Sequence, residues 1–232
     1  RNKIIDRQIY SVNQSIALYE ISKIKMYSDS SESINLIQKA LKLREYFPPY
    51  VCLYIDLLID KNKLNDAKKY LHKVWINNPH PEYKYKIKLL AEKMKISLYD
   101  LVKYITKGYE DLSESRILLA ESLIEIEKWT EAKKQISNLL EHKPSKEVCI
   151  LMSKIEEGDT NDPQKVNAWI SRSNFGDLNK IWICSITNIS QSNWSSVSDS
   201  GYFNTLEWEK PKLIRDFQSS NIETNIIKYI NN

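Results

Sequence analysis

The sequence predicts an all-α fold, a solenoid of stacked helical hairpins with a small irregular, short-strand appendage at its C-terminal end. Three observations predict it. Apolar residues recur at helical spacing between residues 3 and 173, one four-position pattern recurs along that stretch, and the 232 residues include only 4 Gly. Because glycine is the residue that tight β-turns most often require, its scarcity favours helices over sheets.

The recurring pattern is a small residue, apolar residues four and seven positions later, and a proline beyond the helix end. Two complete copies and one copy without the proline are present: Ala67, Leu71, Val74 and Pro79; Ala132, Ile136, Leu139 and Pro144; and Ser33, Ile37 and Ala40, each 34 residues before its counterpart in the first copy. The second helix of a tetratricopeptide (TPR) unit has this pattern, and such units repeat about every 34 residues. The sequence therefore resembles a TPR array.

The helical spacing divides into five hairpins, and residues that break helices separate them. The expected helices pair as 3–27 with 32–43, 50–60 with 64–76, 82–94 with 98–108, 114–126 with 130–141, and 145–157 with 163–173. We expect Pro48-Pro49 to end the helix before them, since proline cannot donate a backbone hydrogen bond. Ser97 is expected to cap the helix that follows it.

From residue 176 onward the helical pattern stops. Tryptophans stand among Ser, Asn and Thr, and residues 182–184 and 202–206 read as short strands around a serine-rich loop at 190–200. A last helix is expected near 221–230. The predicted domains are therefore residues 1–175, a TPR-like solenoid, and residues 176–232, a C-terminal cap.

The composition argues against several classes of function. With 34 Lys+Arg against 30 Asp+Glu and no basic cluster interleaved with aromatics, nucleic-acid binding is not indicated. No Gly-rich phosphate loop or nucleophile motif supports an enzyme or a cofactor. The 3 His and 3 Cys lack the spacing of a metal site, and the scattered cysteines Cys52, Cys149 and Cys184 suit a reducing compartment. We therefore expect no catalytic residues, no metal and no cofactor.

Two acidic pairs are the candidate partner-binding residues. Asp56 with Asp60, and Glu121 with Glu125, stand at i and i+4 on the first helices of two hairpins, so each pair forms an acidic stripe. First helices line the groove of a TPR solenoid, where a partner segment docks, and acidic stripes would prefer a basic segment. The alternative, which charge patterns favour more often, is a solvated helix face. Three further aromatic residues, Trp75, Trp129 and Trp169, are predicted to lie in the core.

Two passages are more specific than a generic TPR array. Residues 48–83 contain Trp75-Ile76-Asn77-Asn78-Pro79-His80-Pro81, and residues 147–208 end in Phe203-Asn204-Thr205-Leu206-Glu207-Trp208. Together they resemble the HemY family of bacterial TPR proteins, in its alphaproteobacterial branch.

The resemblance implies a protein–protein scaffold anchored in the bacterial inner membrane by helices before Arg1. The solenoid would lie on the cytoplasmic side, and its protein partners would be enzymes of late heme biosynthesis. Two alternatives stay open. One is a tetrapyrrole-binding carrier or sensor, for which His80 and Cys184 are the candidate axial ligands. The other is an adaptor that presents envelope enzymes to a protease.

One departure from the family concerns a metal. Relatives in this branch often carry two Cys-x-x-Cys turns, as a metal ribbon does. The corresponding positions here are Cys184 with Thr187, and Val197 with Ser200. Because one thiolate out of four cannot hold a tetrahedral zinc ion, we expect the shell of the ribbon without its metal.

Overall fold

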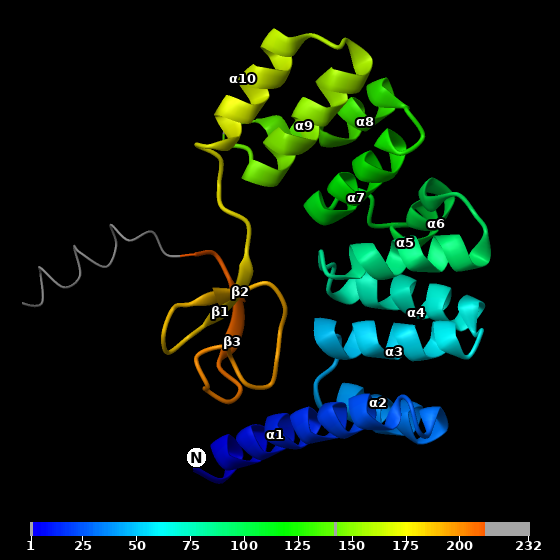
Figure 1. Ribbon diagram of the computed structural model, residues 1–232, viewed down its shortest axis with the longest axis vertical. Coiled ribbons are helices and arrows are strands. Elements are labelled where there is room, and N and C mark those ends of the chain that lie inside the picture. Colours follow the sequence, from blue (N-terminus) through cyan, green and yellow to red (C-terminus); the bar gives the residue numbers. More distant parts are fainter. Residues whose placement is uncertain (1, 142, 212–232) are drawn as a thin grey trace, which may run out of the picture. The chain divides into compact units, whose positions relative to one another are not determined.

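The computed structural model describes residues 2–141 and 143–211, and the helix expected at 221–230 lies outside them. The chain divides between Gly176 and Asp177 into two compact units. The first contains all the helices of the described residues and the second contains a small sheet (Figure 1). Each unit is described by itself.

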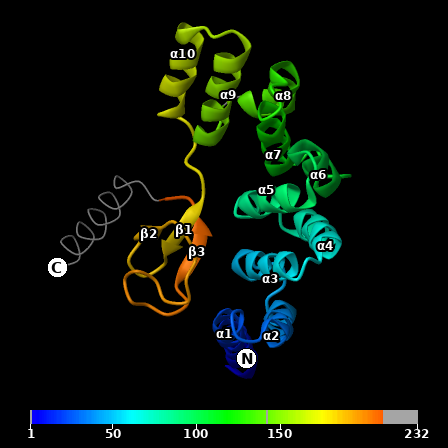
Figure 2. The same cartoon turned by 45° about the vertical axis from the view of Figure 1, so that its right-hand side comes forward.

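The first unit is the predicted series of helical hairpins. Its helices are α1 (Asn2–Lys25), α2 (Ser30–Leu43), α3 (Pro48–Asp60), α4 (Leu64–Asn77), α5 (Tyr83–Met94), α6 (Leu98–Ile105), α7 (Ser113–Ile124), α8 (Trp129–Ile136), α9 (Lys146–Asp159) and α10 (Pro163–Ser173). Each odd-numbered helix packs on the even-numbered helix that follows it, and successive hairpins pack on one another. In Figure 2 the helices α3 and α5 lie on one side of the stack, and α2, α4 and α6 lie on the other. The all-α solenoid is thus confirmed.

The recurring small and apolar positions form the interfaces between helices. Ala67, Leu71 and Val74 are all completely buried, and so are Ala132 and Ile136. A small first residue lets a neighbouring backbone come close, and the apolar residues four and seven positions later lie on the same helix face. The spacing recognised in the sequence therefore marks the packing face of each second helix.

Several helix ends differ from the predicted ones, and the clearest differences concern α3, α6 and α8. α2 already ends at Leu43, and Pro48-Pro49 form the first turn of α3 instead of ending α2, because proline lacks only an N–H that the first turn leaves unpaired anyway. Ser97 occupies the N-cap position of α6, but its side chain makes no capping hydrogen bond. The helix expected at 130–141 is α8 followed by the 3-10 turn η1 (Ser137–Leu140).

The predicted core tryptophans all lie in or against the core. Trp75 is completely buried, and its indole Nε1 donates a hydrogen bond of 2.8 Å to Ser115 Oγ on α7. Trp129 and Trp169 are half-buried and pack against the cluster formed by α7, α8 and α9. Trp129 also covers Gly158, where any side chain would overlap the indole ring.

The second unit is a three-stranded antiparallel sheet in the order β2-β1-β3. The strands are β1 (Ile181–Cys184), β2 (Ser190–Gln191) and β3 (Leu206–Glu209), with Trp182 opposite Gln191 on one side and Trp208 on the other. The strand predicted at 202–206 is wrong in position, since pairing with β1 starts only at Leu206 and Phe203 makes a single bridge to Val197. The loop predicted at 190–200 likewise contains β2.

Candidate partner-binding face

The residues around the Pro-His-Pro corner determine where helix α5 begins. The His80 ring is buried, and its Nδ1 accepts a hydrogen bond of 3.3 Å from the backbone N–H of Glu82. Tyr83, the first residue of α5, is completely buried and donates from its hydroxyl to the carbonyl oxygen of Tyr46. With this end held in place, the alternating sequence of α5 presents three lysines to the neighbouring helices.

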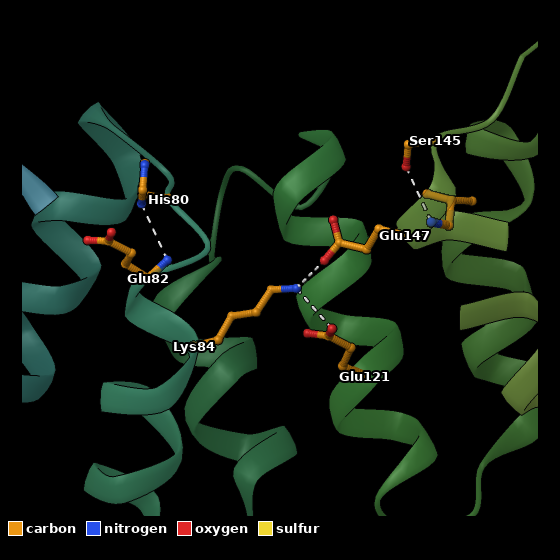
Figure 3. A network of polar contacts seen from close by, with 7 residues as sticks. His80, Glu82, Lys84, Glu121, Ser145 and Glu147 are labelled. Atoms are coloured by element: carbon orange, nitrogen blue, oxygen red, sulfur yellow. Dashed lines mark hydrogen bonds and ion pairs between the residues drawn. The ribbon is translucent and has the colours of Figure 1, made fainter. Parts of the chain in front are cut away.

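Lys84 connects three helices (Figure 3). Its Nζ lies 2.9 Å from Glu121 Oε1 on α7 and 2.7 Å from Glu147 Oε1 on α9. Glu147 is placed in the first turn of α9 by Ser145, whose Oγ accepts a hydrogen bond from the backbone N–H of Val148. Two carboxylates from successive hairpins therefore share one ammonium group.

The pKa values of Lys84 and Glu121 reflect their partial burial. Burial alone would lower the pKa of Lys84, but the carboxylates of Glu121 and Glu147 outweigh that effect and raise it. Burial also raises the pKa of Glu121, and Lys84 opposes the rise only in part. Both directions mean that Lys84 and Glu121 hold their protons more tightly than free side chains would, as expected where burial is combined with a shared cation.

Two further lysines of α5, Lys86 and Lys88, form ion pairs on either side of the helix. Lys88 Nζ lies 2.7 Å from Oε1 of Glu125, the C-cap residue of α7, one helical turn beyond the contact of Lys84 with Glu121. Lys86 Nζ contacts both carboxylate oxygens of Asp56 on α3, at 2.7 and 2.6 Å. Burial raises the pKa of Asp56, and Lys86 opposes the rise.

We call these side chains the charged band: Asp56, Lys84, Lys86, Lys88, Glu121, Glu125 and Glu147. The band crosses α3, α5, α7 and α9, and its four carboxylates and three ammonium groups carry a net charge of −1. Three of the four residues predicted from the sequence belong to it. The fourth, Asp60, is exposed and forms no ion pair within residues 2–141 and 143–211. The acidic stripes are therefore present as residues but are largely neutralised by α5, so their role in binding stays a prediction.

Sequence reasoning missed the lysines of α5 because their partners are 30 to 63 positions away. The alternating run Tyr83-Lys84-Tyr85-Lys86-Ile87-Lys88 was the available signal. Sequence reasoning also missed a cavity of about 340 Å³. The cavity is lined by residues of α2, α3, α4 and the α2–α3 turn: Gln38, Leu41, Lys42, Glu45, Tyr46, Tyr54, Tyr70 and Lys73. This cavity holds three tyrosines from three separate segments, which no local pattern connects.

The candidate ligands for a tetrapyrrole lie elsewhere. Cys184 is buried in the second unit, where hydrogen bonds from Thr187 and Thr205 outweigh burial and lower its pKa to about 6. Neither Cys184 nor His80 belongs to the charged band. Burial raises the pKa of the other two thiols, to about 12 for Cys52, and all three cysteines are free.

A metal ribbon requires four ligands at two facing turns, and the residues present do not fit one. The four positions hold one thiol, two alcohols and a hydrocarbon: Cys184, Thr187, Ser200 and Val197. No group of three or more His, Cys, Asp or Glu side chains in the described part of the chain is arranged to hold a metal ion. A tetrahedral zinc site needs thiolate, imidazole or carboxylate donors, so this set cannot form one.

The fold and the charged band define the class: a TPR-type helical solenoid whose first helices are joined by ion pairs. No protein-family model matches the chain, and no curated protein is similar to it in sequence. Among solved structures, the chain is similar to YrrB, described as a TPR protein with an unusual peptide-binding site. The two share 13% identity at a TM-score of 0.37, over 68% of this chain and 84% of YrrB.

Proposed function

We propose that this chain is a protein-interaction scaffold whose charged band binds a segment of a partner protein. The observation that carries the proposal is the arrangement of Lys84, Glu121 and Glu147, which brings partly exposed charged side chains of three successive hairpins into direct contact. Solenoids use such extended surfaces to bind partners, and a band that spans several repeats is long enough to contact a peptide segment.

The chemistry of the band favours a segment that contains Lys or Arg. Glu121 and Glu125 each contact lysine through Oε1, and both side chains are partly exposed, by 34% and 43%. A carboxylate can accept several hydrogen bonds, so a guanidinium group could join the same carboxylates without displacing the lysines. Asp60 adds one more exposed carboxylate beside Asp56, and the net charge remains negative.

Because the carboxylates are already held in place by α5, little side-chain entropy would be lost when a partner binds. Ion pairs that remain half-exposed contribute mainly to specificity and to the rate of association, and their effect weakens with salt. We therefore expect binding that depends on ionic strength and on where the negative charge stands in the band.

The test is a crosslinking pull-down of the full-length protein from its own cells, read by mass spectrometry, followed by variants of the band. Lys88→Glu combined with Glu125→Lys keeps an ion pair at the same place but moves the carboxylate from α7 to α5. We expect this exchange to weaken partner capture at least several-fold without changing the thermal unfolding midpoint. Equal capture by the exchanged and original proteins would show that the band does not recognise the partner.

Asp60→Lys complements the exchange of Lys88 and Glu125, because it reverses the charge of the exposed carboxylate beside Asp56. Since Asp60 has no ion pair with any other described residue, its replacement tests recognition without breaking one of the ion pairs of the band. By contrast, Glu121→Lys would place a second ammonium group beside Lys84, so the combination of Asp56→Lys with Glu121→Lys would disturb folding as well as binding. Crosslinks that fall on Tyr46, Tyr54 or Tyr70 would instead place the partner at the cavity between α2, α3 and α4.

We further propose, from the resemblance of residues 48–83 and 147–208 to the HemY family, that the partners are enzymes of late heme biosynthesis. The solenoid would then act at the cytoplasmic side of a bacterial inner membrane. None of the helices in the described residues combines the length and hydrophobicity that a membrane crossing requires. Membrane fractionation of the full-length protein tests the location.

Enrichment of ferrochelatase or of another late enzyme of the pathway in the pull-down supports this assignment of the partners. Enrichment of a protease with envelope enzymes would make the protein an adaptor instead. In both cases the scaffold function would stand, and only the identity of the partners would differ.

A further inference from the structure

The second unit contains two tight turns of the same design. The first runs from Cys184 to Thr187 and the second from Val197 to Ser200, so each has two residues between its end positions. Each turn is followed by a residue with left-handed backbone, Asn188 at φ 56° and Gly201 at φ 83°. Left-handed backbone favours Gly and Asn, and the two-residue spacing is that of the ligand pairs in zinc ribbons.

The two turns meet through their last side chains. Thr187 Oγ1 lies 3.0 Å from Ser200 Oγ, within hydrogen-bonding distance. In the first turn, Cys184 Sγ lies 3.3 Å from Thr205 Oγ1. A hydrogen bond between hydroxyl groups therefore joins the two turns, whose end positions are those at which a ribbon would carry its four thiolates.

We propose that the second unit is a metal-ribbon fold that closes without a metal, with the hydrogen bond between Thr187 and Ser200 joining its two turns. The donor set leads to this proposal. Valine has no donor atom, the Val197 side chain is about half exposed at 48%, and neutral alcohols are poor ligands for zinc. The remaining thiol cannot hold a tetrahedral ion alone.

Folding without a metal requires a substitute source of stability, because small units usually rely on metals or disulfides. The aromatic residues of the sheet supply it. The rings of Trp182 and Trp208 pack edge to face with centroids 5.2 Å apart, and Trp182, Trp194 and Leu206 are buried. A buried aromatic core of this kind stabilises the sheet from its faces, while the hydroxyl pair holds its turns together.

The first test measures the metal content and the unfolding of the full chain. We expect substoichiometric zinc after purification without chelator, and the same thermal midpoint in tryptophan fluorescence with and without EDTA. One zinc per chain, or a midpoint that falls on chelation, would overturn the proposal. Ser200→Ala should lower the midpoint of this unit relative to Ser185→Ala, which alters an exposed hydroxyl on the first turn.

The second test restores the missing ligands. The triple variant Thr187→Cys, Val197→Cys and Ser200→Cys should bind one Co²⁺ per chain under reducing conditions, with the absorption spectrum of a tetrahedral thiolate site. Adding Cys184→Ser to this triple variant is the matched control and should weaken Co²⁺ binding at least tenfold. If the triple variant shows no tetrahedral cobalt spectrum, the two turns do not face each other as a ribbon requires.

Discussion

Lys84 on α5 and Glu121 on α7 form an ion pair of 2.9 Å, and the contact of Lys88 with Glu125 repeats it one helical turn later. Both pairs have the same sequence separation of 37 residues. A constant separation over one turn is what two neighbouring helices that run in the same direction produce, because each advances equally along its axis. The equal separation of the two ion pairs thus follows from the parallel course of α5 and α7.

Removal of the central cation should destabilise the solenoid. Lys84→Met leaves Glu121 and Glu147 close together in a half-buried site, so we expect a loss of about 1–2 kcal/mol in the free energy of unfolding at neutral pH, after allowance for solvent screening. Urea unfolding followed by circular dichroism measures it. The control combines Lys84→Met with Glu121→Gln and Glu147→Gln, which removes the repulsion and should recover much of the loss.

The loss of stability in Lys84→Met should depend on pH. Without Lys84, burial and the charge of Glu147 raise the folded-state pKa of Glu121 further above its unfolded value. The penalty is therefore absent below the ordinary glutamate pKa of about 4.3 and grows as the pH rises through the folded-state pKa. Equal penalties at about pH 3 and at neutral pH would contradict the proposed repulsion.

The buried hydrogen bond from Trp75 to Ser115 should contribute more to the free energy of unfolding than the buried hydrogen bond of Ser122 on the same helix. Ser115→Ala leaves the indole N–H without its acceptor, and we expect a loss of about 1–2 kcal/mol in the free energy of unfolding. Ser122→Ala on the same helix removes a buried hydroxyl whose hydrogen bond goes to the carbonyl of Leu119 in the same helix, and should change stability by about 0.5 kcal/mol or less. Similar losses in denaturant unfolding would mean that the bond between α4 and α7 adds little.

Gly158 is required by the packing of Trp129. In Gly158→Ala the new methyl group would overlap the indole ring, so despite the better helix propensity of alanine we expect a net loss of about 1–2 kcal/mol. Trp129→Leu combined with Gly158→Ala gives the methyl group room. A double-mutant cycle from thermal or urea unfolding should therefore show favourable coupling, and simple additivity would indicate that the overlap is relieved elsewhere.

Tyr83 should make the solenoid sensitive to alkali. Burial raises its pKa above the ordinary range, so the unfolded chain releases this proton first and stability falls as the pH rises above about 10, by up to about 1.4 kcal/mol per pH unit. Tyr83→Phe should flatten that fall in unfolding experiments between about pH 9 and 11. Tyr85→Phe, which changes a tyrosine that is 69% exposed, should leave the slope as it was.

The sequence predicted the hairpins well because their signals are local. The small and apolar residues at positions such as Ala67 and Leu71 recur at helical spacing, and that spacing alone defines a buried face. The predictions of where helices begin and end were less accurate. Pro48-Pro49 can end one helix or begin the next, and only the packing around Phe47 and Tyr50 decides between them.

The sequence predicted the carboxylates of the candidate site but not their lysine partners. Asp56, Glu121 and Glu125 stood out as stripes because i and i+4 positions share a helix face, whatever surrounds the helix. Their lysine partners on α5 could not be assigned, since an ion pair depends on which helices become neighbours and in what register. The stripes were expected to be open acidic surfaces, whereas the structure pairs three of the four residues with lysines of α5.

By itself, the sequence determined the all-α class, the five hairpins and the absence of thiolates at three of four ribbon positions, because each depends on residues close together in the chain. The tertiary structure alone decided that Lys84 joins Glu121 to Glu147 and that Thr187 meets Ser200. These contacts link residues 13 to 63 positions apart, and they form only after the hairpins stack and the sheet closes. The ion pairs between hairpins and the hydrogen bond between the two turns therefore depend on tertiary packing. The helices themselves depend on the local spacing of apolar residues.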